Sequence, residues 1–418
     1  MAREYKDSGI EWIGQIPKEW KLATLKQIGT YINGYAFKPE DWTDSGKPII
    51  RIQDLTGSMG SPNFYNGELD SKYLVSKGDI LVSWAATLDA FVWEKNEGWL
   101  NQHIFKALPS SDVNYQFFYW LIKLAMENMN NDNKHGIVMQ HVTTKVFGNF
   151  VVSIPSIDEQ QKIAYYLDKV CGEVDEMVAL QETMIEELKA YKQSVITEAV
   201  TKGLNPAVTM RNSGIDWIGE IPEHWEVRRI GRLFRLRDEK NYKPMEEVQL
   251  LSLYTGIGVF PHGEQEERGN KAVTVEGYKV VHKDDIVVNI ILAWMGAIGV
   301  SDYDGVTSPA YDVYIPDFTK VVPHYFHYVF RTKGIAAECY KYGRGIMMMR
   351  WRTYSSEFKQ ISVPYPSIEE QHKIASYLDT KCSEIDSLIA LKQAKIEELK
   401  EYKKSVIYEY VTGKKEVV

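Results

Sequence analysis

Two long segments of the chain carry the hydrophobic spacing of a coiled-coil helix. Apolar side chains recur every three or four positions through residues 155–201 and 366–412, as in the a/d seam of packed helices. Each segment opens on Pro-Ser and two acidic residues, which favours a helix start. We expect two helices of about 44 residues, each roughly 65 Å long. The expected seam residues are Leu167, Val174, Ile185, Leu188, Leu378, Ile385, Ile396 and Leu399.

These segments belong to a repeat that covers the chain. PSIDEQQKIAYYLD, from residue 155, returns as PSIEEQHKIASYLD, 211 positions later. The phrase SGIEWIGQIPKEW, residues 8–20, returns as SGIDWIGEIPEHW after 205 positions, with nine of its thirteen letters identical. The bodies between these matches, 21–152 and 226–363, resemble each other only faintly. The pattern indicates one frame written twice around two different bodies.

The repeated frame predicts how the helices pair. Neither seam can be buried alone, and a two-fold relation between like units places like helices antiparallel. Polar seam positions at Gln181, Lys192, Lys392 and Lys403 would then help to fix the register. The alternative is that each helix packs only on its own body. Because the second phrase follows the first helix, we expect the first phrase to lie near residues 412–418, with its tryptophans as packing anchors.

The bodies read as mixed α/β. Lys77–Ser83 and His282–Val288 are apolar, β-branched runs led by turn residues, which is typical of strands. Tyr115–Met129 and Tyr325–Lys333 look like short aromatic helices. We therefore expect two α/β domains separated by an antiparallel two-helix coiled coil, with a pseudo-two-fold internal repeat. The expected boundaries are 1–152, 153–206, 207–363 and 364–418.

Composition narrows the class of protein. No stretch approaches 18 apolar residues, the start is polar, and three cysteines make no scaffold, so we expect a cytoplasmic protein without a membrane span. The net charge of −8 argues weakly against nucleic acid. However, residues 153–206 hold 5 Lys and Arg against 10 Asp and Glu, so much of that charge lies in one helix segment.

Catalytic and metal-binding motifs are missing from the sequence. It contains no phosphate-binding loop, dinucleotide fingerprint or zinc-protease motif, so we expect no catalytic residue, metal site or cofactor in this chain. One nuclease-like fragment combines Asp317 with Glu357 and Lys359, but its spacing is long and Val146 replaces Glu357 in the first copy. A nuclease remains a minor alternative.

Binding chemistry is more evident. Residues 339–356 are basic and aromatic without an acid, and residues 133–145 are a weaker counterpart. Arg and Lys suit phosphates and guanine, whereas Asn and Gln suit adenine. A third acid-free run, 227–237, carries five arginines but is equally compatible with an ordinary strand or helix. The candidate DNA-binding residues are Lys134, His135, Gln140, His141, Asn101, Gln102, Tyr311, Lys341, Arg344, Arg350 and Arg352.

The repeated PSIxEQxKIAxYLD segment, the IEELKxYKxSVIxExVT helix and the paired WIGxIPxxW phrases resemble the specificity subunits of type I restriction-modification enzymes. The resemblance covers the whole chain. It implies two target recognition domains, each reading half of a split site in double-stranded DNA. It also implies helices that set the spacing and dock two methyltransferase subunits.

The same resemblance implies a subunit without catalytic activity of its own. S-adenosylmethionine, ATP and Mg²⁺ would then belong to partner subunits, and whether two restriction (motor-nuclease) subunits also join is left open. A different class of protein stays open as well. A structural adaptor could carry two protein-binding or carbohydrate-binding heads on the same coiled-coil spacer. Salt-sensitive binding to duplex DNA would distinguish the two.

Overall fold

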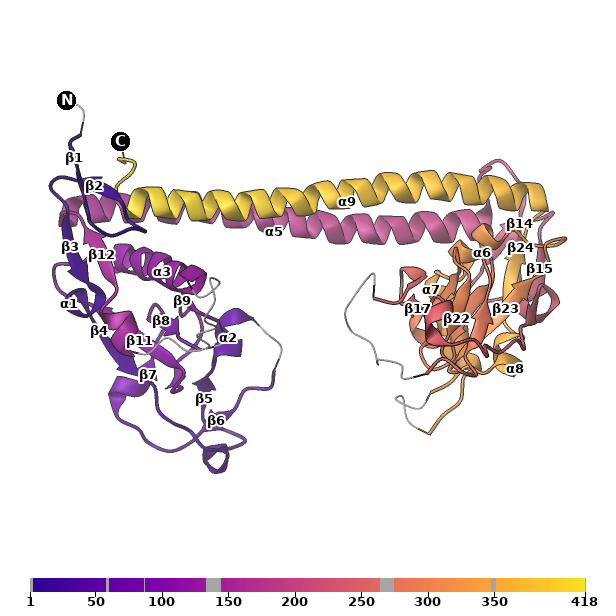
Figure 1. Ribbon diagram of the computed structural model, residues 1–418, viewed down its shortest axis with the longest axis horizontal. Helices are drawn as coiled ribbons and strands as arrows, with labels where there is room; N and C mark the ends of the chain where they lie inside the picture. The colour runs from indigo at the N-terminus through magenta and orange to yellow at the C-terminus, as the bar shows by residue number, and fades with distance from the viewer. Residues whose placement is uncertain are drawn as a thin grey trace. The chain divides into compact units, whose positions relative to one another are not determined.

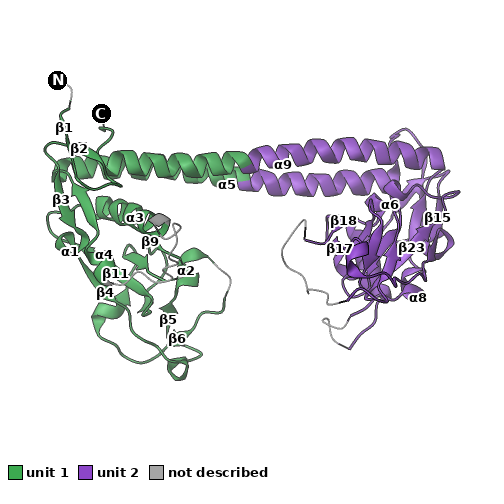
Figure 2. Ribbon diagram, viewed as in Figure 1, with its two compact units in different colours: residues 1–181, 394–418 green, residues 182–393 purple. Residues whose placement is uncertain are grey.

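The computed structural model describes residues 3–57, 60–85, 87–132, 144–263, 274–346 and 351–417. The chain forms two compact units (Figure 2). Unit 1 comprises residues 1–181 and 394–418, and unit 2 comprises residues 182–393. Each unit combines an α/β body with parts of two long helices, α5 (Ile157–Lys202) and α9 (Ile368–Val411). None of the helices in the described ranges has the length and hydropathy needed to cross a bilayer.

The body of unit 1 is built on two four-stranded sheets, with strand orders β4-β11-β8-β9 and β6-β5-β10-β7. Strands β1 and β2 form a hairpin, and β3 pairs with β12. The bounds are β1 Tyr5–Asp7, β2 Gln15–Pro17, β3 Lys21–Thr24, α1 Leu25–Ile28, β4 Gly29–Asn33, β5 Lys47–Ile50, α2 Ile52–Thr56, β6 Phe64–Tyr65, β7 Leu74–Val75, β8 Ile80–Ser83, β9 Asp89–Val92, β10 Gly98–Leu100, β11 Ile104–Pro109, α3 Tyr115–Asp132, α4 Thr144–Gly148 and β12 Val151–Ile154.

The body of unit 2 repeats the first of these sheets, in the order β16-β23-β20-β21, and surrounds it with two-stranded pairs. Figure 1 labels the elements of both bodies. The bounds are β13 Met210–Asn212, β14 Glu220–Pro222, β15 Glu226–Arg229, β16 Phe234–Leu236, β17 Leu251–Tyr254, β18 Gly258–Pro261, β19 Lys279–Val281, β20 Ile286–Asn289, β21 Ile298–Val300, β22 Gly305–Thr307, β23 Tyr311–Pro316, α6 Pro323–Val329, α7 Lys333–Tyr342, α8 Ser355–Phe358 and β24 Ser362–Tyr365.

The long helices run antiparallel within each unit. In unit 1, Tyr166 and Tyr410 lie with ring centroids 4.4 Å apart, and Lys403 pairs with Asp175 at 2.6 Å. As the residue numbers rise along α5, those of their partners on α9 fall. In unit 2, Lys192 pairs with Asp386 at 2.6 Å, and Lys392 Nζ lies 3.4 Å from Met184 Sδ. The expected fold class of mixed α/β domains with an antiparallel helix pair is confirmed.

The helix pair also contributes to both hydrophobic cores, so the helices pack on the bodies as well as on each other. The beginning of α5 joins the core of unit 1, and its last turns join the core of unit 2. Of the expected seam residues, Leu188 is half-buried and the others are buried. The buried ones are Leu167, Val174, Ile185, Leu378, Ile385, Ile396 and Leu399.

The glutamine of each repeated PSIxEQ segment is buried and attaches a body to the helix that begins there. Gln160 accepts a hydrogen bond from the Asn114 amide at 2.8 Å, and Gln371 accepts the same bond from the Val322 amide. Further along the helices, the Trp120 indole donates a hydrogen bond to Asp168 of α5, and the Tyr328 hydroxyl donates one to Asp379 of α9, each at 2.7 Å. Buried polar groups must be paired, so these glutamines fix where each body joins the helix. Because these bonds match in pairs, each residue of α3 corresponds to the residue 208 positions later, in or after α6.

The opening phrase anchors both ends of the frame. The indole of Trp20 is fully buried and donates to Glu159 at 2.9 Å, and Trp225 donates to Glu370 at 3.0 Å. In unit 1, Tyr408 donates to the carbonyl of Trp12 at 3.2 Å. The predicted closeness of the first phrase to the end of α9 is confirmed.

One expectation for the second body needs correction. The helix expected over Tyr325–Lys333 ends at Val329, and a new helix begins at Lys333. Thr332 causes the break, because its hydroxyl accepts from the amide of Ile335 and caps α7. The arginine-rich run 227–237 lies largely in strands β15 and β16, with Ile230 and Leu233 buried. This outcome matches the structural alternative for that run.

Candidate nucleic-acid interface

The described residues 344–346 and 351–352 of the basic, acid-free segment of unit 2 lie antiparallel after the end of α7, and we call them the hairpin. Arg344 and Arg352 exchange both backbone hydrogen bonds, at 2.9 and 3.0 Å. Gly343 permits the turn, because a Cβ there would stand 2.4 Å from the Trp351 ring nitrogen. The indole of Trp351 stacks on Tyr340 at 5.1 Å and donates to its carbonyl. Aromatic packing therefore holds the base of the hairpin on the helix.

The charges of this hairpin are partly engaged inside the body. The Arg344 guanidinium lies 3.3 Å from Glu357 and 5.2 Å above the ring of Tyr354, yet its side chain is 68% exposed. Lys341 pairs with Glu338 at 3.4 Å and is also largely exposed. Ile346, two residues after Arg344, is 94% exposed. The hairpin thus presents arginine, lysine and apolar groups to solvent, a combination suited to phosphates and base edges.

The candidate Tyr311 lies at the start of β23, opposite Asn289 of β20. Burial raises the pKa of its hydroxyl, and Asn289 offers it a hydrogen bond that acts in the opposite direction. The next residue, Ile290, accepts a hydrogen bond from the amide of Thr353 at 2.9 Å, so the hairpin and this end of the sheet are tied together. The structure therefore brings Tyr311 into the neighbourhood of the hairpin through β20.

In unit 1, Asn101 and Gln102 form the turn between β10 and β11. The Gln102 amide donates to the carbonyl of Tyr35 at 3.0 Å, and its side chain lies 3.4 Å from the His103 ring. Both candidates are half-buried, and His103 is exposed. Gly34 is needed beside this turn, since a Cβ would collide with the Asn101 carbonyl. This turn is a polar edge that joins the two sheets of the body.

Five of the candidate residues lie outside the described ranges. The structure therefore gives no position for the four candidates of segment 133–145 or for one arginine of segment 339–356. These residues are Lys134, His135, Gln140, His141 and Arg350.

The residues of the nuclease alternative have ordinary partners. Asp317 pairs with Lys320 at 2.5 Å, and hydrogen bonds from Lys320 and Thr319 lower the pKa of its carboxyl to about 2. Glu357 pairs with Arg344 instead. Among the residues described, no three His, Cys, Asp or Glu side chains gather as a metal site would require. The geometry gives this alternative no support.

Two basic residues that are not among the candidate DNA-binding residues also line a groove of unit 2. Arg331 follows α6 and Lys333 opens α7, and both face the side of α5 that bears Lys192. No charge run or motif marks them in the sequence. The signal that could have found them is alignment of the two bodies through their helix contacts, which places Arg331 at the position of Lys123.

Comparison with known proteins gives a consistent result. The family model described as type I restriction modification DNA specificity domain matches twice, over residues 17–190 and 222–401. The EcoBI specificity subunit of Escherichia coli is 24% identical over 415 residues, covering 93% of this chain and 84% of that protein. The MjaVIII specificity subunit of Methanocaldococcus jannaschii is 22% identical over 414 residues, covering 96% and 94%.

A solved structure shares the fold. It belongs to a study of complex assembly and conformational transition of the type I R-M system, and one of its chains superposes with a TM-score of 0.69. The alignment covers 95% of this chain and 98% of that one at 14% identity. Because the family model matches most of the sequence, in two copies, this chain belongs to the type I restriction-modification DNA specificity family.

Proposed function

We propose that this chain is the sequence-recognition subunit of a type I restriction-modification complex, and that each body reads one half of a bipartite site in double-stranded DNA. The observation that carries the proposal is the double match of a DNA specificity domain to one chain whose frame repeats and whose bodies differ. Two different readers on one frame are what an asymmetric, two-part target requires.

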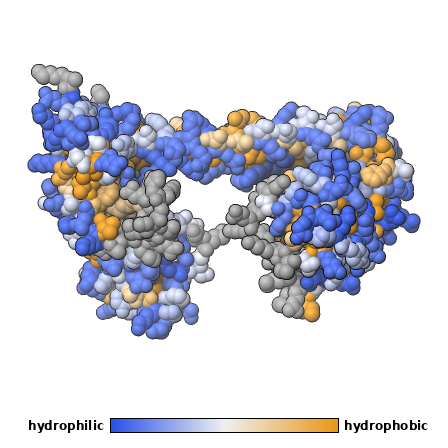
Figure 3. Space-filling model, viewed as in Figure 1, coloured by the Kyte–Doolittle hydropathy of each residue, from blue (hydrophilic) through white to orange (hydrophobic). Residues whose placement is uncertain are grey.

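The long helices α5 and α9 carry a surface that could bind a partner protein, in addition to acting as a spacer. Each unit exposes the same three apolar positions on its helices, namely Met177, Leu180 and Tyr402 in unit 1 and Leu388, Leu391 and Tyr191 in unit 2. Figure 3 shows apolar side chains on the surface of the helix pair. All six immediately precede a seam position, so within each helix they lie on one side of the seam. Exposed apolar groups of this kind mark protein-binding surfaces.

Because the positions match across the repeat, the surface suits two copies of one partner, which we assign to two methyltransferase subunits. The chain itself is then non-catalytic. S-adenosylmethionine would bind the methyltransferase partners. ATP and Mg²⁺ would serve restriction subunits where these join.

The test of the function is methylome sequencing of a host strain with and without the gene. The proposal expects a bipartite adenine-methylated motif that disappears with the gene. An unchanged methylome, together with no salt-sensitive duplex binding by the chain and its methyltransferase subunits, would favour the adaptor alternative.

A spacer role has its own test. Matched seven-residue insertions in α5 and α9 preserve the heptad pattern and lengthen each helix by about 10 Å. The half-sites should then separate by about three further base pairs, at 3.4 Å each. Unchanged half-site spacing would refute the spacer role.

A further inference from the structure

Each unit contains a groove where its body meets the helix pair, and the two grooves share helix positions. The groove of unit 1 is lined by Lys400, Lys403, Lys404, Ile407, Asp175 and Val178 of the long helices. The groove of unit 2 is lined by the residues that the repeat places at the same positions, Lys189, Lys192, Gln193, Ile196, Asp386 and Ile389. Their volumes are about 430 and 390 Å³. They are therefore counterparts within the repeated frame.

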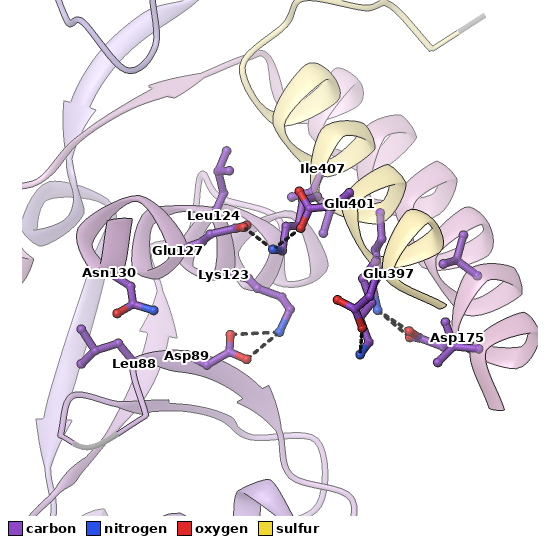
Figure 4. A pocket seen from close by; sticks show the side chains of 15 residues that line it. Leu88, Asp89, Lys123, Leu124, Glu127, Asn130, Asp175, Glu397, Glu401 and Ile407 are labelled. Atoms are coloured by element: carbon purple, nitrogen blue, oxygen red, sulfur yellow. Dashed lines mark hydrogen bonds and ion pairs between the residues drawn. The ribbon is translucent and has the colours of Figure 1, made fainter. Parts of the chain in front are cut away.

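The groove of unit 1 balances its charges internally (Figure 4). Four lysines line it together with five carboxylates, and each lysine has an ion pair. Lys123 of α3 pairs with Asp89 of β9 at 2.9 Å, and Lys404 pairs with Glu401 at 2.7 Å. The other two pairs are Lys403 with Asp175 and Lys400 with Glu397.

The groove of unit 2 does not balance its charges. Lys189, Lys192, Arg331 and Lys333 line it, with Asp386 as its one acidic residue among those described. Asp386 is already paired with Lys192, and Lys189 pairs with Glu186 outside the groove. The side chains of Arg331 and Lys333 make no ion pair or hydrogen bond with any residue that the structure describes.

One strand position removes the carboxylate that would pair with Arg331. Asp89 stands opposite Ser83 in the β8–β9 pair, and the matching position in the β20–β21 register is Ala297, whose carbonyl accepts from Asn289. The carboxylate that pairs with Lys123 in unit 1 is thus replaced by a buried alanine. Arg331, the counterpart of Lys123, keeps its charge but lacks the internal partner.

The surroundings of Arg331 hold cations as well as the carboxylate of Asp386. Its guanidinium lies against the start of β18, where a Cβ on Gly258 would stand 3.3 Å from Nη2. Burial, followed by the charges of Arg331, His324 and Lys192, lowers the pKa of His327 to about 3. The first turn of α7, which lines the same groove, adds the positive end of a helix dipole. Arg331 is half-buried whereas Lys333 is exposed, and a half-buried cation without an internal partner is costly unless an anion joins it.

We propose that the groove of unit 2 binds a phosphate group between Arg331, Lys333 and the Lys192 side of α5. The planar guanidinium suits phosphate oxygens, and Lys333 supplies a second cation beside it. The phosphate can come from the DNA backbone or from a free phosphate compound. The DNA source rests on the proposed function, whereas binding of a free phosphate does not.

The first experiment titrates inorganic pyrophosphate into the full chain at low salt by calorimetry. The wild type should bind, and Arg331→Gln should weaken binding at least tenfold. Ala297→Asp, which restores the internal carboxylate, should weaken it as well. Lys123→Gln, the matched change in unit 1, should leave binding unchanged. Thermal unfolding shows whether each variant is folded. If Ala297→Asp does not fold, the comparison of Arg331→Gln with the wild type still tests the proposal.

The second experiment measures duplex DNA binding by the chain with its methyltransferase subunits between 50 and 200 mM salt. Loss of one phosphate contact reduces the salt slope by about 0.9, so the wild type should lose about 3.5-fold more affinity over this range than Arg331→Gln. A reduced slope assigns the phosphate to DNA. An unchanged slope with Arg331-dependent pyrophosphate binding assigns it to a free compound.

The proposal is overturned if pyrophosphate binding and the salt slope are both the same in Arg331→Gln as in the wild type. Failure of the proposed function looks different. In that case the wild type itself does not bind duplex DNA, and the pyrophosphate titration alone decides whether the groove binds phosphate.

Discussion

Lys403 of α9 pairs with Asp175 of α5 in unit 1, and Lys192 of α5 pairs with Asp386 of α9 in unit 2. These two ion pairs are one contact written twice, 211 positions apart. The bodies behave differently. Lys123 of α3 and Arg331, which follows α6, occupy matching positions, yet Lys123 pairs with Asp89 whereas Arg331 makes no ion pair with any residue that the structure describes. The frame therefore preserves contacts that both halves need, whereas the bodies change the chemistry they present.

The repeated tryptophans give the strongest test of the frame. Trp20 and Trp225 are both buried and donate to Glu159 and Glu370. Trp225→Ala should destabilise unit 2 by about 3–5 kcal/mol, since it empties a large core site. Hydrogen exchange should show amides of β20 losing protection while those of β8 keep theirs. Trp20→Ala should produce the reverse pattern, and equal loss in both units would contradict independent bodies.

The hairpin of unit 2 tests whether the bodies read DNA separately. Arg344→Ala should cost about 1–3 kcal/mol in binding a duplex with both half-sites, and should relax recognition at one half only. Competition binding against duplexes altered in either half measures this. Lys341→Ala, in the last turn of the preceding helix α7, should weaken binding more uniformly across sequences if it contacts only phosphate. Equal relaxation at both halves by Arg344→Ala would argue against separate readers.

The acid stability of unit 2 should depend on Glu370. Partial burial acts to raise its pKa, but hydrogen bonds from His224, Trp225 and Ser367 outweigh it and lower the pKa to about 2. A depressed carboxyl pKa gives stability above the ordinary value near 4.5, which is lost as the pH falls toward 2. Urea unfolding of unit 2 between these values should show this decline. In Glu370→Gln the decline should be smaller; an identical decline would contradict the assignment.

The smallest effect is expected for the ion pairs of the frame. The carboxylates Asp386 and Asp175 are more than half exposed, so Lys192→Ala and Lys403→Ala should each cost about 0.2–1 kcal/mol. The two values should agree, because the contacts are equivalent under the repeat. Urea unfolding monitored by hydrogen exchange gives the free energy of unfolding of each unit for this comparison. A difference above about 1 kcal/mol would show that the frame is less symmetric than its sequence.

The frame could be predicted from the sequence because its signals are local and repeated. Heptad spacing located α5 and α9, and the returning phrase predicted that residues 8–20 lie near residues 412–418, where Lys414 donates to the carbonyl of Ile13. The break between α6 and α7 was missed, because the aromatic pattern continues through Thr332 while its hydroxyl caps a new helix. Local capping there decided the structure against the hydrophobic pattern.

The grooves could not be predicted in the same way. The pairing of Lys123 with Asp89 joins α3 to a strand 34 positions earlier, and its absence in unit 2 depends on the register of β20 and β21. Only the sheet register identifies Ala297 as the position of the missing carboxylate. The candidate DNA-binding residues of the hairpin rest on residue chemistry, and they remain predictions.

Exchange of one body between related subunits shows whether the two bodies read DNA independently. Residues 226–363 would be replaced by the corresponding body of a related specificity subunit, and the adenine methylome of the host would be sequenced. If the bodies are independent readers, one half of the bipartite motif should change while the other half and the spacing stay the same. A change in both halves, or no change in either, would contradict two independent readers on a shared frame.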